Sequence, residues 1–247
     1  MAVTLYTDKY EPDGGAGYDS KSVNAQGITD INANNELKLA LLHEDDFKGD
    51  SSALWTNETT GGFFNQDGGN VYFAEATGTS LDPKLVVTYT DGSTETHYAD
   101  SSGNFDDAWM RVGPESSEAN LLSARNGEDA DYITDSITNL IIGHYKSIGS
   151  GYMSRAIFRF ATNASKTASS AVLHFYMLAD ITSGFLRREW HDKGFYVCKM
   201  SSDVSTTFGT EDWSHLDGWE SSGSYEGYDP GGDDEVLYNA TFFGANF

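Results

Sequence analysis

Cysteine and basic residues are scarce in this chain of 247 residues, which excludes disulfides within the chain and argues against anionic partners. Cys198 is the single cysteine, so no disulfide forms within the chain, and we expect it to be a buried, inert thiol in an apolar strand. The chain has 15 Lys and Arg against 38 Asp and Glu, a formal net charge of −23. Such a surface repels phosphates and anionic headgroups, so we expect no nucleic acid and no membrane insertion.

Long apolar runs and helical periodicity are also lacking. The first residues carry Asp8, Lys9 and Glu11 and include no apolar run that fits a signal peptide or a membrane span. We therefore expect either a protein released by cell lysis, as virion proteins are, or a piece of a longer chain.

Glycine and aromatic residues are plentiful. There are 26 glycines and 13% aromatic residues but only four prolines, which is typical of short strands joined by tight turns. The length suffices for one large or two smaller β-domains with a buried core. The composition predicts an all-β protein, an antiparallel β-sandwich or jelly roll.

Runs of β-branched and aromatic residues separated by polar turn residues predict the strands. In two of them alternate residues fall on opposite faces. The predicted strands lie at 37–42, 71–74, 85–89, 94–98, 109–112, 140–142, 156–160, 171–176 and 195–200. Asp91-Gly92 predicts a type I′ hairpin turn, and the glycines in residues 11–24 predict an exposed loop.

Four segments in the middle of the chain carry a family resemblance. Residues 130–133, 140–143, 155–160 and 170–176 resemble, in that order, the first half of a DNRLRE-type module, a family related to the disaggregatase repeats. Where the family has an acidic residue after its Phe, this chain has Ala161 after Phe160. The resemblance implies a β-sandwich of carbohydrate-binding-module type, as found in surface proteins and in phage structural proteins.

The order of the two halves is exchanged relative to that family. Segments similar to the closing strands lie at 28–31, 36–39, 70–75 and 82–89. We therefore divide the chain into a closing half at 1–98, a connection at 99–122 and an opening half at 123–247. The sandwich can be completed in three ways. The halves pair within the chain, as in a circular permutation, or between neighbouring chains by strand exchange, or each half pairs with sequence outside this chain. Since an unpaired half exposes sheet edges, we expect a multimer.

Catalytic motifs are missing from the sequence. The six histidines form no ligand pair at a spacing that zinc sites use, and Gly149-Ser150-Gly151 is no nucleophile elbow. Pairs of acidic residues occur by chance in so acidic a chain. We therefore expect a protein that is not an enzyme.

Two binding sites are predicted near the C-terminus. Flat aromatic rings stack on sugars, and the candidate carbohydrate-binding residues are Arg188, Trp190, Trp213, Trp219, Tyr225 and Tyr228. The alternative is that several of the tryptophans are core or interface anchors. Carboxylates in a Gly-rich loop suit calcium, and the candidate ligands are Asp229, Asp233, Asp234 and Glu235. The alternative is a solvated acidic loop.

Together these patterns predict a non-enzymatic structural protein of a virion, as a capsid decoration or a tail or fibre component. Its expected partners are copies of itself, other virion proteins and surface glycans. The alternatives are a carbohydrate-binding module of a secreted or cell-surface protein and a subunit of an extracellular filament, both of which place the protein outside the cell.

Overall fold

Short antiparallel strands dominate the structure, a computed structural model. It describes residues 5–7, 17–48, 65–74, 78–99, 107–127, 129–136, 138–147, 149–177, 187–188, 195–201, 204 and 208–216. The strands are β1 (Gly17–Ser22), β2 (Glu36–His43), β3 (Asn65–Tyr72), β4 (Lys84–Tyr89), β5 (Thr94–Tyr98), β6 (Asp107–Glu115), β7 (Tyr132–Thr134), β8 (Asn139–Ser147), β9 (Ser150–Ala161), β10 (Ala168–Met177), β11 (Arg187–Arg188) and β12 (Phe195–Lys199). The helices are α1 (Ala25–Asn34), α2 (Glu44–Lys48), α4 (Glu118–Arg125) and the 3-10 turn η1 (Thr210–Trp213).

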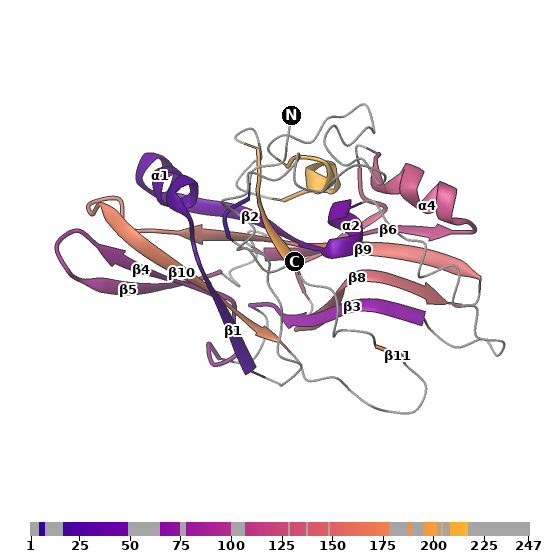
Figure 1. Ribbon diagram of the computed structural model, residues 1–247, viewed down its shortest axis with the longest axis horizontal. Helices are drawn as coiled ribbons and strands as arrows, with labels where there is room; N and C mark the ends of the chain where they lie inside the picture. The colour runs from indigo at the N-terminus through magenta and orange to yellow at the C-terminus, as the bar shows by residue number, and fades with distance from the viewer. Residues whose placement is uncertain are drawn as a thin grey trace, which may run out of the picture.

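The strands pair along the path β12-β2-β9-β8-β3-β10-β4-β5, with β1 on β10, β6 on β9 and β7 on β6 (Figure 1). Every pairing is antiparallel except that of β11 with β3. The long strand β9 pairs with β8 near its start, with β2 near its end, and with β6 along most of its length. The sheet path does not close, and the fold is an all-β, sandwich-like architecture, as the sequence predicts.

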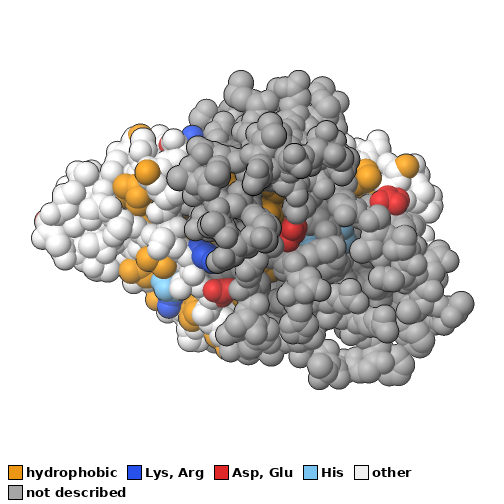
Figure 2. Space-filling view, viewed as in Figure 1, with side chains coloured by type: hydrophobic (Ala, Val, Ile, Leu, Met, Phe, Trp, Pro, Cys, Tyr) orange, Lys and Arg blue, Asp and Glu red, His pale blue; other side chains and the backbone are white. Residues whose placement is uncertain are grey.

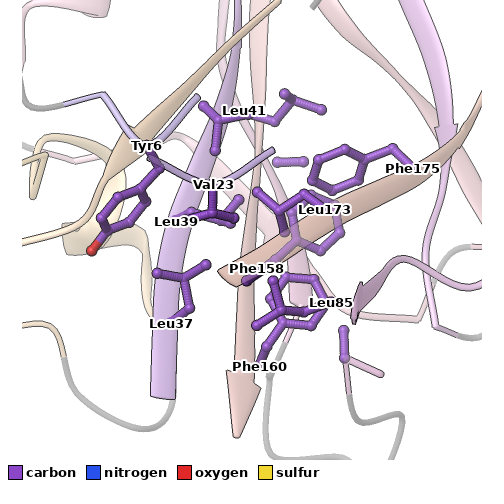
Figure 3. Packing of buried hydrophobic residues seen from close by; sticks show 14 of the residues in the cluster. Tyr6, Val23, Leu37, Leu39, Leu41, Leu85, Phe158, Phe160, Leu173 and Phe175 are labelled. Carbon is purple, nitrogen blue, oxygen red and sulfur yellow. The ribbon is translucent and has the colours of Figure 1, made fainter. Parts of the chain in front are cut away.

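One hydrophobic core lies between two layers of strands. Alternate residues of β2 and β9 point toward alternate residues of β4 and β10, so that Phe158 of β9 contacts Phe175 of β10 at 5.1 Å between ring centroids. Figure 3 shows the leucines and phenylalanines of the four strands interdigitating. The labelled members of these strands are Leu37, Leu39, Leu41, Leu85, Phe158, Phe160, Leu173 and Phe175.

A second core lies on the opposite face of β2, β6, β9 and β12. Ala40, Ile157 and Cys198 belong to it, and Phe47 of α2, Leu121 of α4 and Trp213 of η1 cover them. Because β2 is buried on both faces, its sequence is an almost continuous apolar run rather than an alternation. The expectation for Cys198 is confirmed, since the thiol is buried and burial raises its pKa above the ordinary value.

Residues 28–31, predicted as a closing strand, lie instead in helix α1. Two local caps explain the difference: the side chain of Asn24 accepts the N–H of Gly27 at 3.0 Å, and Asn35 takes a left-handed conformation with φ of 58°. Ile31 and Ile28, three residues apart, then lie on one helix face and pack on the first core.

Two further local predictions are wrong. Residues 17–22 lie in the predicted loop but form β1, because they pair along β10. The hairpin between β4 and β5 exists, but its turn is not type I′. That type needs a positive φ at both central residues, whereas Gly92 has φ of 83° and Asp91 has no positive φ. The Gly92 N–H donates to the Tyr89 carbonyl at 3.0 Å, and the left-handed Gly92 then follows a turn at 90–91.

The two halves of the sequence pair with one another inside a single chain. Strands β2, β3 and β4 of residues 1–98 lie against β9, β8 and β10 of residues 123–247. The segment 99–122 contributes β6, which pairs with β9 and β7, in addition to connecting the halves. Of the three arrangements expected, the described strands therefore show pairing within the chain, and the multimer stays a prediction.

Candidate functional site: the tyrosine face

The outward face of the layer β1-β10-β4-β5 carries an aromatic cluster. Along β10, Leu173 and Phe175 are buried in the first core, so His174 and Tyr176 point outward and are half-buried. The strand register places Tyr18 opposite Tyr176, and Lys84 between His174 and Tyr98. We call the set Tyr18, Tyr72, Asp82, Lys84, Tyr98, His174 and Tyr176 the tyrosine face. Figure 2 shows hydrophobic, histidine and basic side chains close together on the part of the surface over β4 and β10.

Three tyrosine rings meet at Tyr176. Its centroid lies 5.2 Å from that of Tyr18 and 5.5 Å from that of Tyr72, with interplanar angles of 81° and 86°. Such edge-to-face contacts hold the rings in fixed orientations without covering all of their faces. Tyr98 is 38% exposed, which makes it the most accessible ring of the set.

Two basic side chains sit among the rings. The Nζ atom of Lys84 lies 3.9 Å from the centroid of the Tyr18 ring, a cation–π contact. His174 contacts the same ring edge-on at 6.2 Å. Burial, and then the charge of Lys84, lower the pKa of His174, so its imidazole is neutral at pH 7 and carries one donor and one acceptor nitrogen.

Asp82 is the unusual group of the tyrosine face. It is 5% exposed, and its Oδ1 atom accepts no hydrogen bond from the described residues. Burial raises the pKa of its carboxyl to about 6. Its backbone carbonyl accepts the Tyr18 hydroxyl at 2.9 Å. Burial, followed by the Asp82 charge, raises the pKa of Tyr18 to about 12, so this hydroxyl stays a donor.

The tyrosine face therefore combines aromatic surface with hydrogen-bonding groups that are mostly neutral. Flat rings favour the C–H faces of sugars, while an imidazole, phenolic hydroxyls and an open carboxyl oxygen suit hydroxyl groups. Buried polar atoms in native proteins nearly always have partners, so Asp82 Oδ1 is an acceptor open to a donor from water or from a ligand.

The sequence patterns do not identify the tyrosine face. Tyr18 lies in the segment predicted as a loop, and Tyr72 and Tyr176 lie in predicted strands without a predicted role. One signal is present in the sequence: in the alternation of β10 the residues opposite the buried positions are Val172, His174 and Tyr176, a composition unusual for a solvated face.

The predicted carbohydrate-binding residues are not brought together by the described part of the chain. Trp213 is 1% exposed and lies in the second core, so it is a core anchor, the alternative considered for it, and it offers no ring face to a sugar. Arg188 lies in β11, which runs parallel to β3. The remaining candidates are outside the described residues: Trp190, Trp219, Tyr225 and Tyr228, together with the calcium candidates Asp229, Asp233, Asp234 and Glu235.

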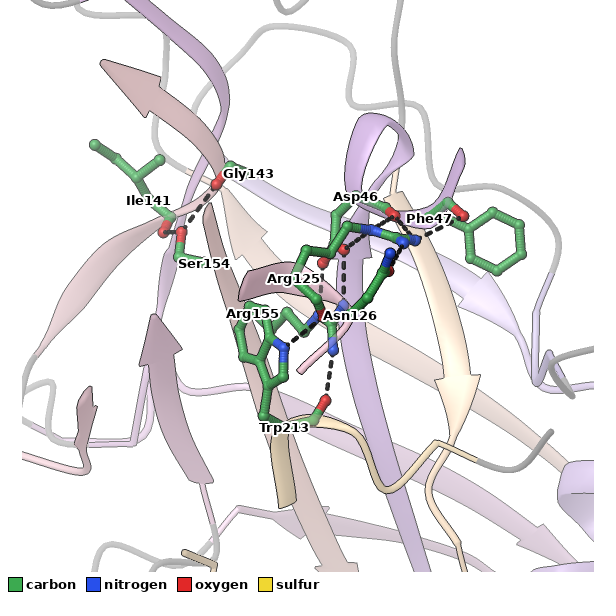
Figure 4. Close-up of polar contacts among 9 residues, drawn as sticks. All are labelled: Asp46, Phe47, Arg125, Asn126, Ile141, Gly143, Ser154, Arg155 and Trp213. Carbon is green, nitrogen blue, oxygen red and sulfur yellow. Dashed lines mark hydrogen bonds and ion pairs between the residues drawn. The ribbon is translucent and has the colours of Figure 1, made fainter. Parts of the chain in front are cut away.

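A buried ionic network holds Trp213 in place (Figure 4). The side-chain carboxylate of Asp46 of α2 accepts two hydrogen bonds from Arg155 of β9, at 2.6 and 2.8 Å, and one from Arg125 of α4 at 3.1 Å. The Trp213 indole donates to the Arg125 carbonyl at 2.9 Å, and the Arg155 guanidinium lies 3.8 Å from its ring centroid. Burial works to raise the pKa of Asp46, but Arg155 and then Arg125 outweigh it, and the pKa lies below its ordinary value.

This network is structural. Asp46, Arg125 and Arg155 are each at most 2% exposed, so no ligand reaches them in this conformation. Their bonds tie α2, α4 and η1 to the central strand β9 and so keep the second core covered.

Comparison with known proteins gives no relative: no protein-family model, no curated protein and no solved structure matches this chain. Within the described ranges, no three His, Cys, Asp or Glu side chains are grouped to hold a metal ion. None of the described helices is long and apolar enough to cross a membrane.

Proposed function

We propose that this chain is a non-enzymatic structural protein built on a β-sandwich, and that it contacts glycans through the tyrosine face. The observation that carries the proposal is the clustering of four tyrosines with a buried carboxyl oxygen that accepts no hydrogen bond from the described residues. Together they suit a ligand that presents both C–H faces and hydroxyl groups.

The charge distribution favours a glycan over a strongly charged ligand. The chain carries −23 overall, whereas Lys84 and a carboxyl with a raised pKa leave the tyrosine face close to neutral. A polycation would bind more strongly to the acidic surface elsewhere, and a polyanion would be repelled by it.

Binding is a better fit to the tyrosine face than catalysis. Glycoside hydrolysis normally needs two carboxyl groups on opposite sides of the scissile bond. Asp82 is the sole carboxylate that the described residues contribute to the tyrosine face. Tyr18 also stays protonated because of its raised pKa, which suits it to donate to a ligand rather than to act as a base.

The setting of the protein is proposed from sequence. The acidic surface and the resemblance to a family of phage structural and surface proteins support a virion component that assembles as a multimer. A carbohydrate-binding module of a secreted or cell-surface protein would use the tyrosine face in the same way. A calcium ion at Asp229, Asp233, Asp234 and Glu235 stays a prediction, which a melting temperature measured with and without EDTA tests.

Glycan binding is tested on the full chain with an array of neutral and acidic oligosaccharides, followed by titration calorimetry of the best ligand. Tyr98→Ala and Tyr176→Ala should each weaken binding about fivefold, since a lost ring contact is worth about 1 kcal/mol. The matched control is Tyr132→Ala, because Tyr132 is 46% exposed but lies on β7, outside the tyrosine face. Absence of binding on the array, or equal losses in all three variants, would overturn the proposal.

A further inference from the structure

A second aromatic cluster surrounds Arg111 of β6. The strand register brings side chains of β8, β9, β6 and β7 together: Tyr145 pairs with Tyr152, Arg111 pairs with Tyr132, and Arg111 lies opposite Ser154, two residues along β9 from Tyr152. The rings of Tyr145 and Tyr152 stack at 4.7 Å. We call the set Trp109, Arg111, Tyr132, Tyr145 and Tyr152 the Arg111 cluster.

The rings hold the Arg111 guanidinium in a defined position. Its Cζ atom lies 5.0 Å from the ring centroid of Tyr152, 5.4 Å from that of Tyr132 and 5.7 Å from that of Trp109. Its Nη1 atom donates to the Tyr145 hydroxyl at 3.2 Å. An arginine held in this way has lost most of its side-chain freedom and so loses little more on binding.

The charge of Arg111 is nevertheless unpaired. Arg125 and Arg155 both bond to Asp46, and Arg159 pairs with Glu36 at 2.7 Å. Among the arginines whose side chains are described, Arg111 alone makes no ion pair, and its buried Nε atom has no hydrogen-bond partner. In a chain with 38 acidic residues, such an arginine calls for an explanation.

A carboxylate lies beside the Arg111 cluster without pairing to it. The Asp131 N–H donates to the Arg111 carbonyl at 2.9 Å, so the two backbones are adjacent. The exposed Asp131 side chain turns instead to the Gly113 N–H, which donates to its Oδ2 atom at 2.7 Å. Asp131 is exposed and Arg111 is half-buried, so neighbouring backbone positions at this edge of the sheet carry opposite charges, and the exposed Tyr132 follows Asp131 directly in sequence.

We propose that two copies of this chain associate through the Arg111 cluster about a two-fold axis, with Arg111 of each copy paired to Asp131 of the other. A two-fold interface requires a self-complementary surface, and adjacent opposite charges flanked by aromatic rings provide one. Arg, Tyr and Trp are also the residues that contribute most to protein interfaces. The inference rests on the multimeric part of the proposed function and is independent of glycan binding.

Long-range repulsion between two copies that each carry −23 opposes this dimer. At about 0.15 M salt, charges more than about 8 Å apart are largely screened, whereas a contacting ion pair between aromatic rings is screened much less. Association should therefore strengthen as salt rises from about 0.01 M to about 0.15 M, the reverse of a contact held by attraction between exposed charges.

The test is sedimentation velocity on the full chain over a range of concentrations. Arg111→Gln and Asp131→Asn should each weaken dimerisation at least tenfold, although the second lowers the repulsion between copies. Asn at position 131 keeps an acceptor for the Gly113 N–H, so the fold is preserved. The controls are Lys21→Gln on β1 and Asp91→Asn in the turn before β5, which make the same changes in charge away from the Arg111 cluster and should leave the dimer unchanged.

Two further experiments test directly whether Arg111 of one copy pairs with Asp131 of the other. The double variant should be no weaker than either single variant, because both remove the same contact. Arg111→Asp and Asp131→Arg should each fail to dimerise alone but form a heterodimer when mixed. A monomer at every concentration would overturn the multimer as well as this inference. A dimer whose dissociation constant is unchanged by Arg111→Gln and Asp131→Asn would overturn this interface but not the multimer. Neither result tests glycan binding, which the array measures separately.

Discussion

Replacement of Asp82 by asparagine should stabilise the protein at neutral pH. Burial raises the pKa of this carboxyl from an ordinary 3.8 to about 6 in the folded state. The folded state therefore holds the proton more tightly than the unfolded state. Stability from this group is fully present below pH 3.8 and is lost as the pH rises through about 6. At pH 7 the folded protein contains a desolvated carboxylate, which the neutral amide of Asp82→Asn removes.

The magnitude follows from the size of the shift. One pKa unit corresponds to about 1.4 kcal/mol, so the ionised carboxyl lowers the free energy of unfolding by up to about 3 kcal/mol at pH 7. By the same relation the loss is only about 1 kcal/mol at about pH 4.5. The gain of Asp82→Asn over the wild type should shrink accordingly between the two pH values.

Urea unfolding at about pH 7 and about pH 4.5, followed by intrinsic fluorescence, measures both differences. The control is Asp129→Asn, which removes the same charge from an exposed position and should change the free energy of unfolding by less than about 0.5 kcal/mol. An Asp82→Asn variant less stable than the wild type at neutral pH, or a gain independent of pH, would refute the reasoning. The same variant should bind glycans more weakly, because a neutral amide oxygen accepts a hydroxyl hydrogen bond less strongly than a carboxylate oxygen does.

Three other substitutions or probes test the structure itself. Asp46→Ala should cost about 3–5 kcal/mol in urea unfolding, because it leaves two buried guanidinium groups without their carboxylate, whereas Glu36→Gln at a half-exposed ion pair should cost at most about 1 kcal/mol. Phe158→Ala should cost about 3–5 kcal/mol through the cavity it leaves, and Val172→Ala on the outward face of β10 far less. Cys198 should react with a thiol reagent only at the rate of unfolding, and rapid labelling in the native state would contradict its burial.

Sequence patterns locate best the strands whose own residues are a run of apolar side chains or an alternation of apolar and polar ones. β2 and β12 carry apolar residues on both faces, and β10 alternates from Ala171 to Met177, so their hydrophobic residues identify them. β1, with the sequence GYDSKS, has no such pattern, and its strand conformation comes from pairing along β10. Tertiary pairing of this kind is invisible to local propensity.

The candidate site is hidden from sequence for a related reason. Its residues are separated widely along the chain, from Tyr18 on β1 to Tyr176 on β10, and only the register of the sheet brings them together. Trp213 carries no sequence signal of its burial, and it is the aromatic anchor of an ionic network. Aromatic residues in Gly- and Ser-rich stretches serve both roles, so composition alone does not separate them.

The two sides of the central strands β2 and β9 are covered differently, and this difference leaves the tyrosine face at the surface. In the second core, α2, α4, η1 and the Asp46 network cover one face of β9 and β2. The other face is covered by β4 and β10, whose own outward residues have no described helix over them. A solvated surface at that position is normally Lys, Glu and Thr, as it is at the exposed Thr94 and Thr96 of β5, whereas the tyrosine face carries four tyrosines and a buried carboxyl beside Lys84. Because burial of the Asp82 carboxyl opposes folding at neutral pH, Asp82→Asn separates the two roles of this residue: it should raise stability while it weakens any glycan binding.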